Sequence, residues 1–109
     1  MYITILTPKQ ELRFKLFPYE TQFYRVSGIY AFLIIPPNYS DTNPFYHLLY
    51  VGITNNLQNR FRNHHKLQQA IQQGITHIGI IKASSGKKRK ATERILLQAL
   101  NPPLNQTWL

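Results

Sequence analysis

The run from Gly28 to Ile35 constrains the fold of this chain more than any other stretch. Its sequence, GIYAFLII, is apolar on both alternating faces, as expected of a β-strand that is covered on both sides. Pro36 and Pro37 end the strand, because proline lacks the N–H that a sheet ladder needs. The chain is therefore predicted to form a layered fold with packing on both faces of a sheet.

A second strand is predicted over residues 46–51 (YHLLYV), which a polar loop separates from the first. The simplest arrangement pairs it antiparallel with residues 28–35. That pairing would bring Tyr30 and Tyr50 near each other, each beside a glycine motif. Residues 75–81 (ITHIGII) form the third predicted strand.

One helix is predicted between the second and third strands and another after the third. The first begins after Gly52, where a Thr-Asn-Asn cluster offers N-caps, and continues until Gly74 stops it. The second runs from Lys87 to Leu100, and the two prolines at 102–103 end it. The predicted order is β-β-α-β-α, which gives a small three-stranded α/β sandwich.

The chain has the length of one domain, with 109 residues. We assign residues 27–109 to this domain. Residues 1–26 contain two short stretches with strand-like alternation, at 2–6 and 12–16, and are predicted to form an N-terminal extension packed on the same domain.

The composition excludes some sites and compartments. There is no cysteine, so disulfides and thiolate metal sites are excluded. The sequence has no apolar run of membrane-spanning length, and its N-terminus has neither a basic leader nor a cleavable apolar segment. We therefore expect a cytoplasmic protein that does not bind to a membrane.

Positive charge dominates the chain and is concentrated after Asp41. The sequence has 13 Lys and Arg against 4 Asp and Glu, which gives a formal net charge of +9. After Asp41 there are nine basic residues and a single carboxylate, Glu93. Such a surface attracts polyanions, so nucleic acid, and DNA in the first place, is the predicted partner. The alternative on charge alone is a basic protein that is merely soluble.

Four consecutive basic residues, 87–90, open the last predicted helix. The helix dipole already places positive charge there, so cations are disfavoured by a few tenths of a kcal/mol each at exposed positions. Phosphate is the natural compensating ligand, although a solvated basic turn remains the alternative. The residues predicted to contact nucleic acid are Arg62, Lys66, Lys87, Lys88, Arg89 and Lys90.

Side chains suited to phosphate gather around the second glycine motif. Arg60 and His64 are four residues apart and so are expected on one face of the first helix, above the strand end that carries Tyr50. Glu93 has two open interpretations. It either pairs with a basic neighbour on its own helix or holds a divalent cation together with substrate phosphate.

In this order and spacing, the motifs resemble those of the GIY-YIG nuclease superfamily. The resemblance covers residues 27–106 and rests on several separated motifs that agree in sequence, spacing and predicted context. Valine replaces isoleucine in the second naming motif, and Ile53 and Thr54 stand where many members carry a lysine or a serine. The matching segments are GIY at 28–30, YVG at 50–52, Arg60, His64, Glu93 and PLN at 103–105.

The resemblance implies a fold of the α/β (α+β) class, with a three-stranded antiparallel sheet flanked by helices. It also implies a role for each matched side chain. Glu93 would bind one Mg²⁺ or Mn²⁺ ion per site, and Arg60 would stabilise the charge that grows on the phosphate. One of two tyrosines would position and help deprotonate the attacking water, while a histidine helps and an asparagine orients the site. The catalytic residues so implied are Tyr30, Tyr50, Arg60, His64 and Asn105.

The predicted protein is a metal-dependent endonuclease that hydrolyses phosphodiester bonds of DNA and cuts one strand per active site. The alternative is a nucleic-acid-binding module that keeps the nuclease fold without turnover, and a basic protein–protein adaptor is a third interpretation. Cleavage of both strands would need a homodimer or two separate binding events. Selectivity would come from residues 1–26, the loop at 36–44 or a targeting partner protein.

Overall fold

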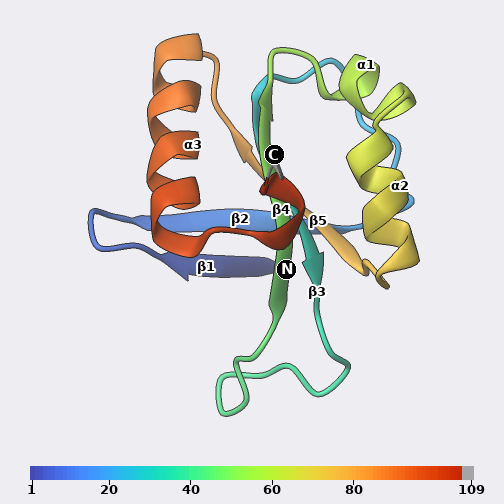
Figure 1. The fold of residues 1–109 in the computed structure, drawn as a ribbon, viewed down its shortest axis with the longest axis vertical. Coiled ribbons are helices and arrows are strands. Elements are labelled where there is room, and N and C mark those ends of the chain that lie inside the picture. The colour runs from blue at the N-terminus through green and yellow to red at the C-terminus, as the bar shows by residue number, and fades with distance from the viewer. Residues whose placement is uncertain (107–109) are drawn as a thin grey trace.

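Five strands form one antiparallel sheet in the computed structural model, which describes residues 1–106 (Figure 1). Their order across the sheet is β1-β2-β5-β3-β4, so β1 and β4 are the edge strands. The strand bounds are β1 (Tyr2–Leu6), β2 (Glu11–Pro18), β3 (Gly28–Ile34), β4 (His47–Thr54) and β5 (His77–Lys82).

The prediction of an antiparallel sheet flanked by helices is confirmed, but its size was wrong. The three predicted strands are β3, β4 and β5, which lie side by side. Two more strands come from residues 1–26. In β2 the residues Leu12, Phe14 and Leu16 are buried while those between them are exposed, and β2 pairs antiparallel with β5. The N-terminal residues therefore extend the sheet itself.

The helical region after β4 consists of two short helices, α1 (Leu57–Arg62) and α2 (His65–Gln72), so the prediction of one continuous helix was wrong. The chain leaves the helical conformation at Asn63 (φ −148°) and His64 (φ −108°, ψ 103°). This break turns the His64 side chain into the interior, where it is only 2% exposed. Gly74 follows α2 with a φ of +95°, a conformation that glycine adopts without strain.

The last helix, α3 (Gly86–Leu100), has the predicted ends. The Ser85 side chain caps it by accepting a hydrogen bond from the Lys88 backbone N–H. Asn101 ends it in the left-handed conformation, with φ 46° and ψ 61°. Pro102 cannot continue the helix, and the chain goes on into a short 3₁₀ helix, η1 (Pro103–Asn105).

Each face of the sheet has its own core. On one face, Leu96 of α3 packs with Val51 and with the buried residues of β1 and β2. On the other face, Leu57 of α1 packs with Tyr30 and Phe32. Figure 1 shows α3 on one side of the sheet and α1 and α2 on the other. Accordingly β3 is buried over all but its last residue, as predicted for a strand covered on both sides.

No helix within residues 1–106 is long and apolar enough to cross a membrane.

Candidate active site

Tyr30 and Gly52 form a close cross-strand pair between the two glycine motifs. Tyr30 on β3 lies opposite Gly52 on β4. A side chain at Gly52 would collide with the phenol ring of Tyr30. The glycine of the 50–52 motif therefore allows Tyr30 to lie across the neighbouring strand.

Tyr30 and His64 make a buried hydrogen bond. The Tyr30 Oη and His64 Nε2 atoms are 2.7 Å apart, and the two side chains are 1% and 2% exposed. Aromatic rings surround the imidazole: the centroids of Phe32, Tyr50 and Phe61 lie 5.3, 5.5 and 6.0 Å from its centroid. The second ring nitrogen, Nδ1, is buried without a hydrogen-bond partner among residues 1–106. The hydrogen-bonded pair of Tyr30 and His64 thus lies inside an aromatic layer whose packing does not require polar groups.

Burial keeps both members of this pair neutral. It raises the pKa of the Tyr30 phenol far above its usual value, and Tyr50 raises it further while Arg60 opposes the shift. Burial also lowers the pKa of His64 to about 4, and the positive charge of Arg60 adds to this effect, followed by His65 and Lys66. At neutral pH the pair is therefore a phenol joined to an uncharged imidazole that is able to accept a proton.

Tyr50 and Arg60 form the solvent-accessible side of the cluster. The Tyr50 ring stacks on Phe32, with centroids 5.4 Å apart, and lies 6.1 Å from the ring of Tyr30. The predicted closeness of the two tyrosines is thereby confirmed. The positive charge of Arg60 on α1 acts on the pKa values of both Tyr30 and His64. Since Tyr50 and Arg60 are both partly exposed, they are the members able to touch a bound molecule.

Asn105 binds the edge strand next to this cluster. Its side-chain Oδ1 accepts a hydrogen bond from the Val51 N–H, and its Nδ2 donates to the Val51 carbonyl, both at 2.8 Å. The amide thus imitates a neighbouring strand and holds η1 against β4. Asn105 therefore orients the backbone between Tyr50 and Gly52, and both ends of its amide are already engaged.

Glu93 lies on α3, on the other face of the sheet. It lines a groove of about 510 Å³ together with Ile53, Lys90, Arg94 and Leu97. Burial raises the pKa of the carboxyl, and no charged neighbour is a cause of the shift. An ion pair with a basic neighbour would lower the pKa instead.

The residues present fit a divalent ion that is shared with substrate. Within residues 1–106 no three acidic or histidine side chains gather to form a complete metal site. Magnesium is commonly held by one or two carboxylates plus substrate phosphate, with water filling the other positions. The Glu93 carboxylate is partly buried, its pKa shift has burial as its only cause, and it is a suitable single ligand.

The sheet separates the predicted site residues into two groups. Tyr30, Tyr50 and the side chains around His64 lie on the α1 and α2 face, whereas Glu93 lies beside Ile53 on the α3 face. Because β4 is an edge strand, the two faces meet along its outer edge.

The predicted nucleic-acid contacts differ in how free their side chains are. Arg62, Lys87, Lys88 and Lys90 are exposed and Lys66 is partly exposed. Arg89 is engaged internally, since its Nη1 donates to the carbonyls of Ala83 (2.8 Å) and Ser84 (3.0 Å) and fixes the start of α3. The aromatic wall made by Phe32 and Phe61 was not predicted as part of the site, because its apolar spacing indicated only core packing.

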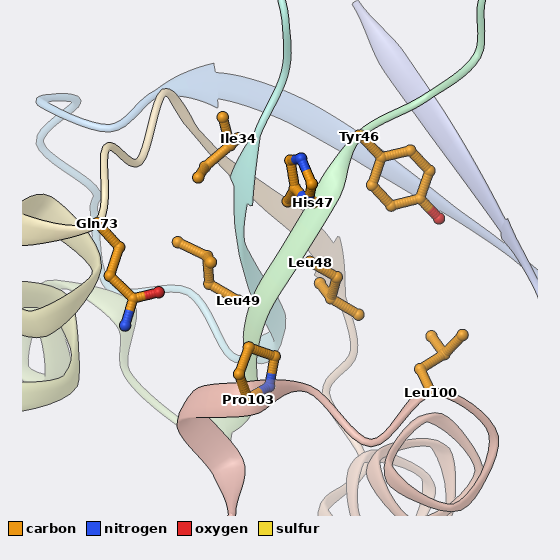
Figure 2. Close-up of a pocket in the computed structure, with 8 residues that line it drawn as sticks. All are labelled: Ile34, Tyr46, His47, Leu48, Leu49, Gln73, Leu100 and Pro103. Carbon is orange, nitrogen blue, oxygen red and sulfur yellow. The ribbon is translucent and has the colours of Figure 1, made fainter.

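A separate hollow of about 590 Å³ lies at the N-terminal half of β4 (Figure 2). Its lining includes Leu49 of β4, Gln73 just after α2 and Pro103 of η1. Its lining includes none of the predicted catalytic residues.

Comparisons of the chain with family models, curated proteins and solved structures gave no match. The resemblance to GIY-YIG nucleases therefore stays a prediction.

Proposed function

We propose that the protein is a divalent-metal-dependent endonuclease that hydrolyses phosphodiester bonds in DNA, one strand per site. The observation that carries the proposal is the buried Tyr30–His64 hydrogen bond beside Arg60. A buried polar pair costs desolvation energy that folding alone does not require. Its members are also the residues that the motif order singles out, although they are far apart in the sequence.

Arg60 is the group that meets the phosphate. Its guanidinium can donate two parallel hydrogen bonds to phosphate oxygens and stabilise the charge that grows on them. Phosphate binding also offsets the positive charge that lowers the pKa of His64. Substrate binding therefore raises the basicity of the imidazole at the stage when a proton has to be accepted.

The tyrosines and His64 carry the proton. Tyr50 is partly exposed and contacts the attacking water, whereas Tyr30 is too deeply buried to do so. Tyr50 accepts the proton that water loses and gives up its own toward Tyr30, whose ring centroid lies 6.1 Å away. Tyr30 in turn passes its own proton to His64 Nε2 along the hydrogen bond between them. This route avoids ionising Tyr30, which its raised pKa disfavours.

Glu93 supplies the carboxylate for one Mg²⁺ or Mn²⁺ ion. When bound, the ion acts as a Lewis acid that neutralises negative charge on the scissile phosphate. Asn105 keeps the β4 backbone fixed beside Tyr50 through its two hydrogen bonds to Val51.

The test is nicking of supercoiled plasmid in the presence of Mg²⁺ or Mn²⁺. Arg60→Lys keeps the positive charge but loses the two parallel N–H donors of the guanidinium. We expect the cleavage rate to fall about 10²-fold or more. Glu93→Gln should abolish cleavage while DNA binding is retained. Arg25→Lys, the same substitution at an exposed arginine outside the predicted site, is the matched control and should keep cleavage. Undiminished cleavage by Glu93→Gln would refute the metal assignment.

The non-catalytic alternative has its own outcome in the same assay. A binding module would retain DNA in a salt-sensitive manner and release no nicked product at any metal concentration.

A further inference from the structure

The hairpin of β1 and β2 exposes one face that no helix within residues 1–106 covers. The alternate residues Ile3, Ile5 and Phe14 are buried in the core beneath it. On the outer face Tyr2 is 48% exposed and Leu6 is 66% exposed. Figure 1 shows β1 and β2 projecting away from the side where α1 and α2 lie. The residues of this outer face are Tyr2, Thr4, Leu6, Glu11, Arg13 and Lys15.

This outer face is continuous with the face that carries the candidate active site. Lys15 lies opposite Tyr2 on one side and opposite Ile80 of β5 on the other, and Ile80 lies opposite Tyr30. Residues directly opposite one another point to the same face of a sheet. Neighbouring strands are about 4.8 Å apart, so two strand spacings, about 10 Å, separate the backbones of Lys15 and Tyr30.

Cations and aromatic rings alternate on the hairpin. The guanidinium carbon of Arg13 lies 4.2 Å from the centroid of the Tyr2 ring. The Lys15 ammonium lies 5.5 Å from the centroid of the Phe17 ring. Rings and guanidinium planes offer surfaces on which unpaired bases stack, and the cations bind the phosphates between them. Glu11 is the one carboxylate on this outer face, and it lies at the far end opposite Leu6.

A groove begins at residues 19–24, which follow β2, and leads to α1; Glu20 is a carboxylate in its lining. Its volume is about 560 Å³, and Phe23, Tyr24, Phe61 and Arg62 are among the residues that line it. Phe23 packs edge to face against Phe17 on the hairpin side and against Phe61 on the α1 side, with both centroid distances 5.4 Å. A series of aromatic contacts thus connects the hairpin to Arg62, a basic residue that was predicted to contact nucleic acid.

We propose that the outer face of the β1–β2 hairpin is a platform for single-stranded DNA. Bases stack on Tyr2 and Arg13, Lys15 binds the phosphate between them, and the strand continues through the groove toward Arg62. The choice of DNA and the direction of the strand rest on the proposed endonuclease function. Bases in a duplex are already stacked, so the platform selects substrates with an unpaired segment next to the cleaved bond.

The test measures binding of a fluorescent oligo(dT) by anisotropy, using the Glu93→Gln protein with EDTA so that cleavage plays no part. The comparison ligands are a duplex hairpin and an abasic oligonucleotide of equal charge. We expect oligo(dT) to bind more tightly than the abasic strand. The double variant Tyr2→Leu, Arg13→Gln should weaken oligo(dT) binding about tenfold or more, since each stacked base contributes substantially. It should change duplex binding much less.

Lys9→Gln is the matched control, because Lys9 is an exposed lysine in the turn between β1 and β2 and lies outside the platform. The Lys9→Gln substitution should weaken the binding of all three ligands slightly and equally. Equal binding of oligo(dT) and the abasic strand would overturn the proposal, and so would unchanged oligo(dT) binding by a correctly folded double variant. Both results are independent of whether the wild-type protein cuts DNA.

Discussion

Replacing His64 by glutamine removes the titrating ring from the buried Tyr30–His64 pair and should flatten the pH dependence of folding stability. The folded protein holds the pKa of His64 at about 4, against 6.5 for an ordinary histidine. Between these values the unfolded chain binds more protons than the folded one. The free energy of unfolding therefore falls as the pH drops from 6.5 toward 4.

The size of this effect follows from the two pKa values. An interval of about 2.5 pH units corresponds to about 3 kcal/mol when it is crossed completely. Between about pH 7.5 and about pH 5 the expected loss is about 2 kcal/mol. The groups that face the imidazole are Tyr30, Tyr50 and Arg60 together with the adjacent His65 and Lys66, and the cations among them act in the same direction as burial.

Urea unfolding followed by circular dichroism at both pH values measures the difference. Between the two pH values, the wild-type protein should lose about 2 kcal/mol more stability than His64→Gln. Contributions from other groups, including His77, whose pKa burial lowers, are common to both proteins and cancel. His65→Gln, at an exposed neighbour, should behave like wild type. An equal loss in wild type and His64→Gln would refute the assignment of a buried, neutral imidazole.

Three further substitutions test the framework around the pair. Gly52→Ala should destabilise the fold by about 2 kcal/mol in the same unfolding assay, because the new methyl group collides with the Tyr30 phenol; an unchanged midpoint would contradict this packing. Asn105→Ala should cost about 1 to 3 kcal/mol, since it leaves the Val51 N–H and carbonyl without their partner. Asn105→Gln, which has the same groups in a longer side chain, should recover little. Glu93→Gln should leave stability at neutral pH unchanged or higher, because burial disfavours the charged carboxylate that it removes; a clear loss of stability would mean that Glu93 has a structural partner.

The central strands were predictable because a run of consecutive apolar residues indicates their burial. The apolar run at 28–35 indicated a strand covered on both faces, and β3 is such a strand. The alternation at 12–16 indicated one buried face as well, but alternation does not say which strand lies alongside. The pairing of Lys15 with Ile80 joins distant parts of the chain, and no local signal encodes it. The sheet was therefore predicted two strands too small.

The candidate site was predictable as a set of residues more than as an arrangement. Antiparallel pairing was enough to bring Tyr30 and Tyr50 together. The break before His64 was not predicted, because Asn63 is only a weak helix-breaking signal, and burial beside Tyr30 depends on tertiary packing.

Strand β4 determines how the two parts of the proposed site can act on one phosphate. Successive residues of a strand point to opposite faces, so Tyr50 belongs to the phenol cluster while Ile53 borders the groove of Glu93. Asn105 binds the outer edge of β4 at Val51, and beyond that point the edge leads to Ile53 and Thr54. In the proposed function, a phosphodiester at this end of β4 would meet Arg60 from one face and Glu93 from the other. A single strand is thin enough to follow such an edge, whereas a duplex would have to open first. The proposed nuclease site and the proposed hairpin platform therefore place the same requirement on the substrate, an unpaired segment at the cleaved bond.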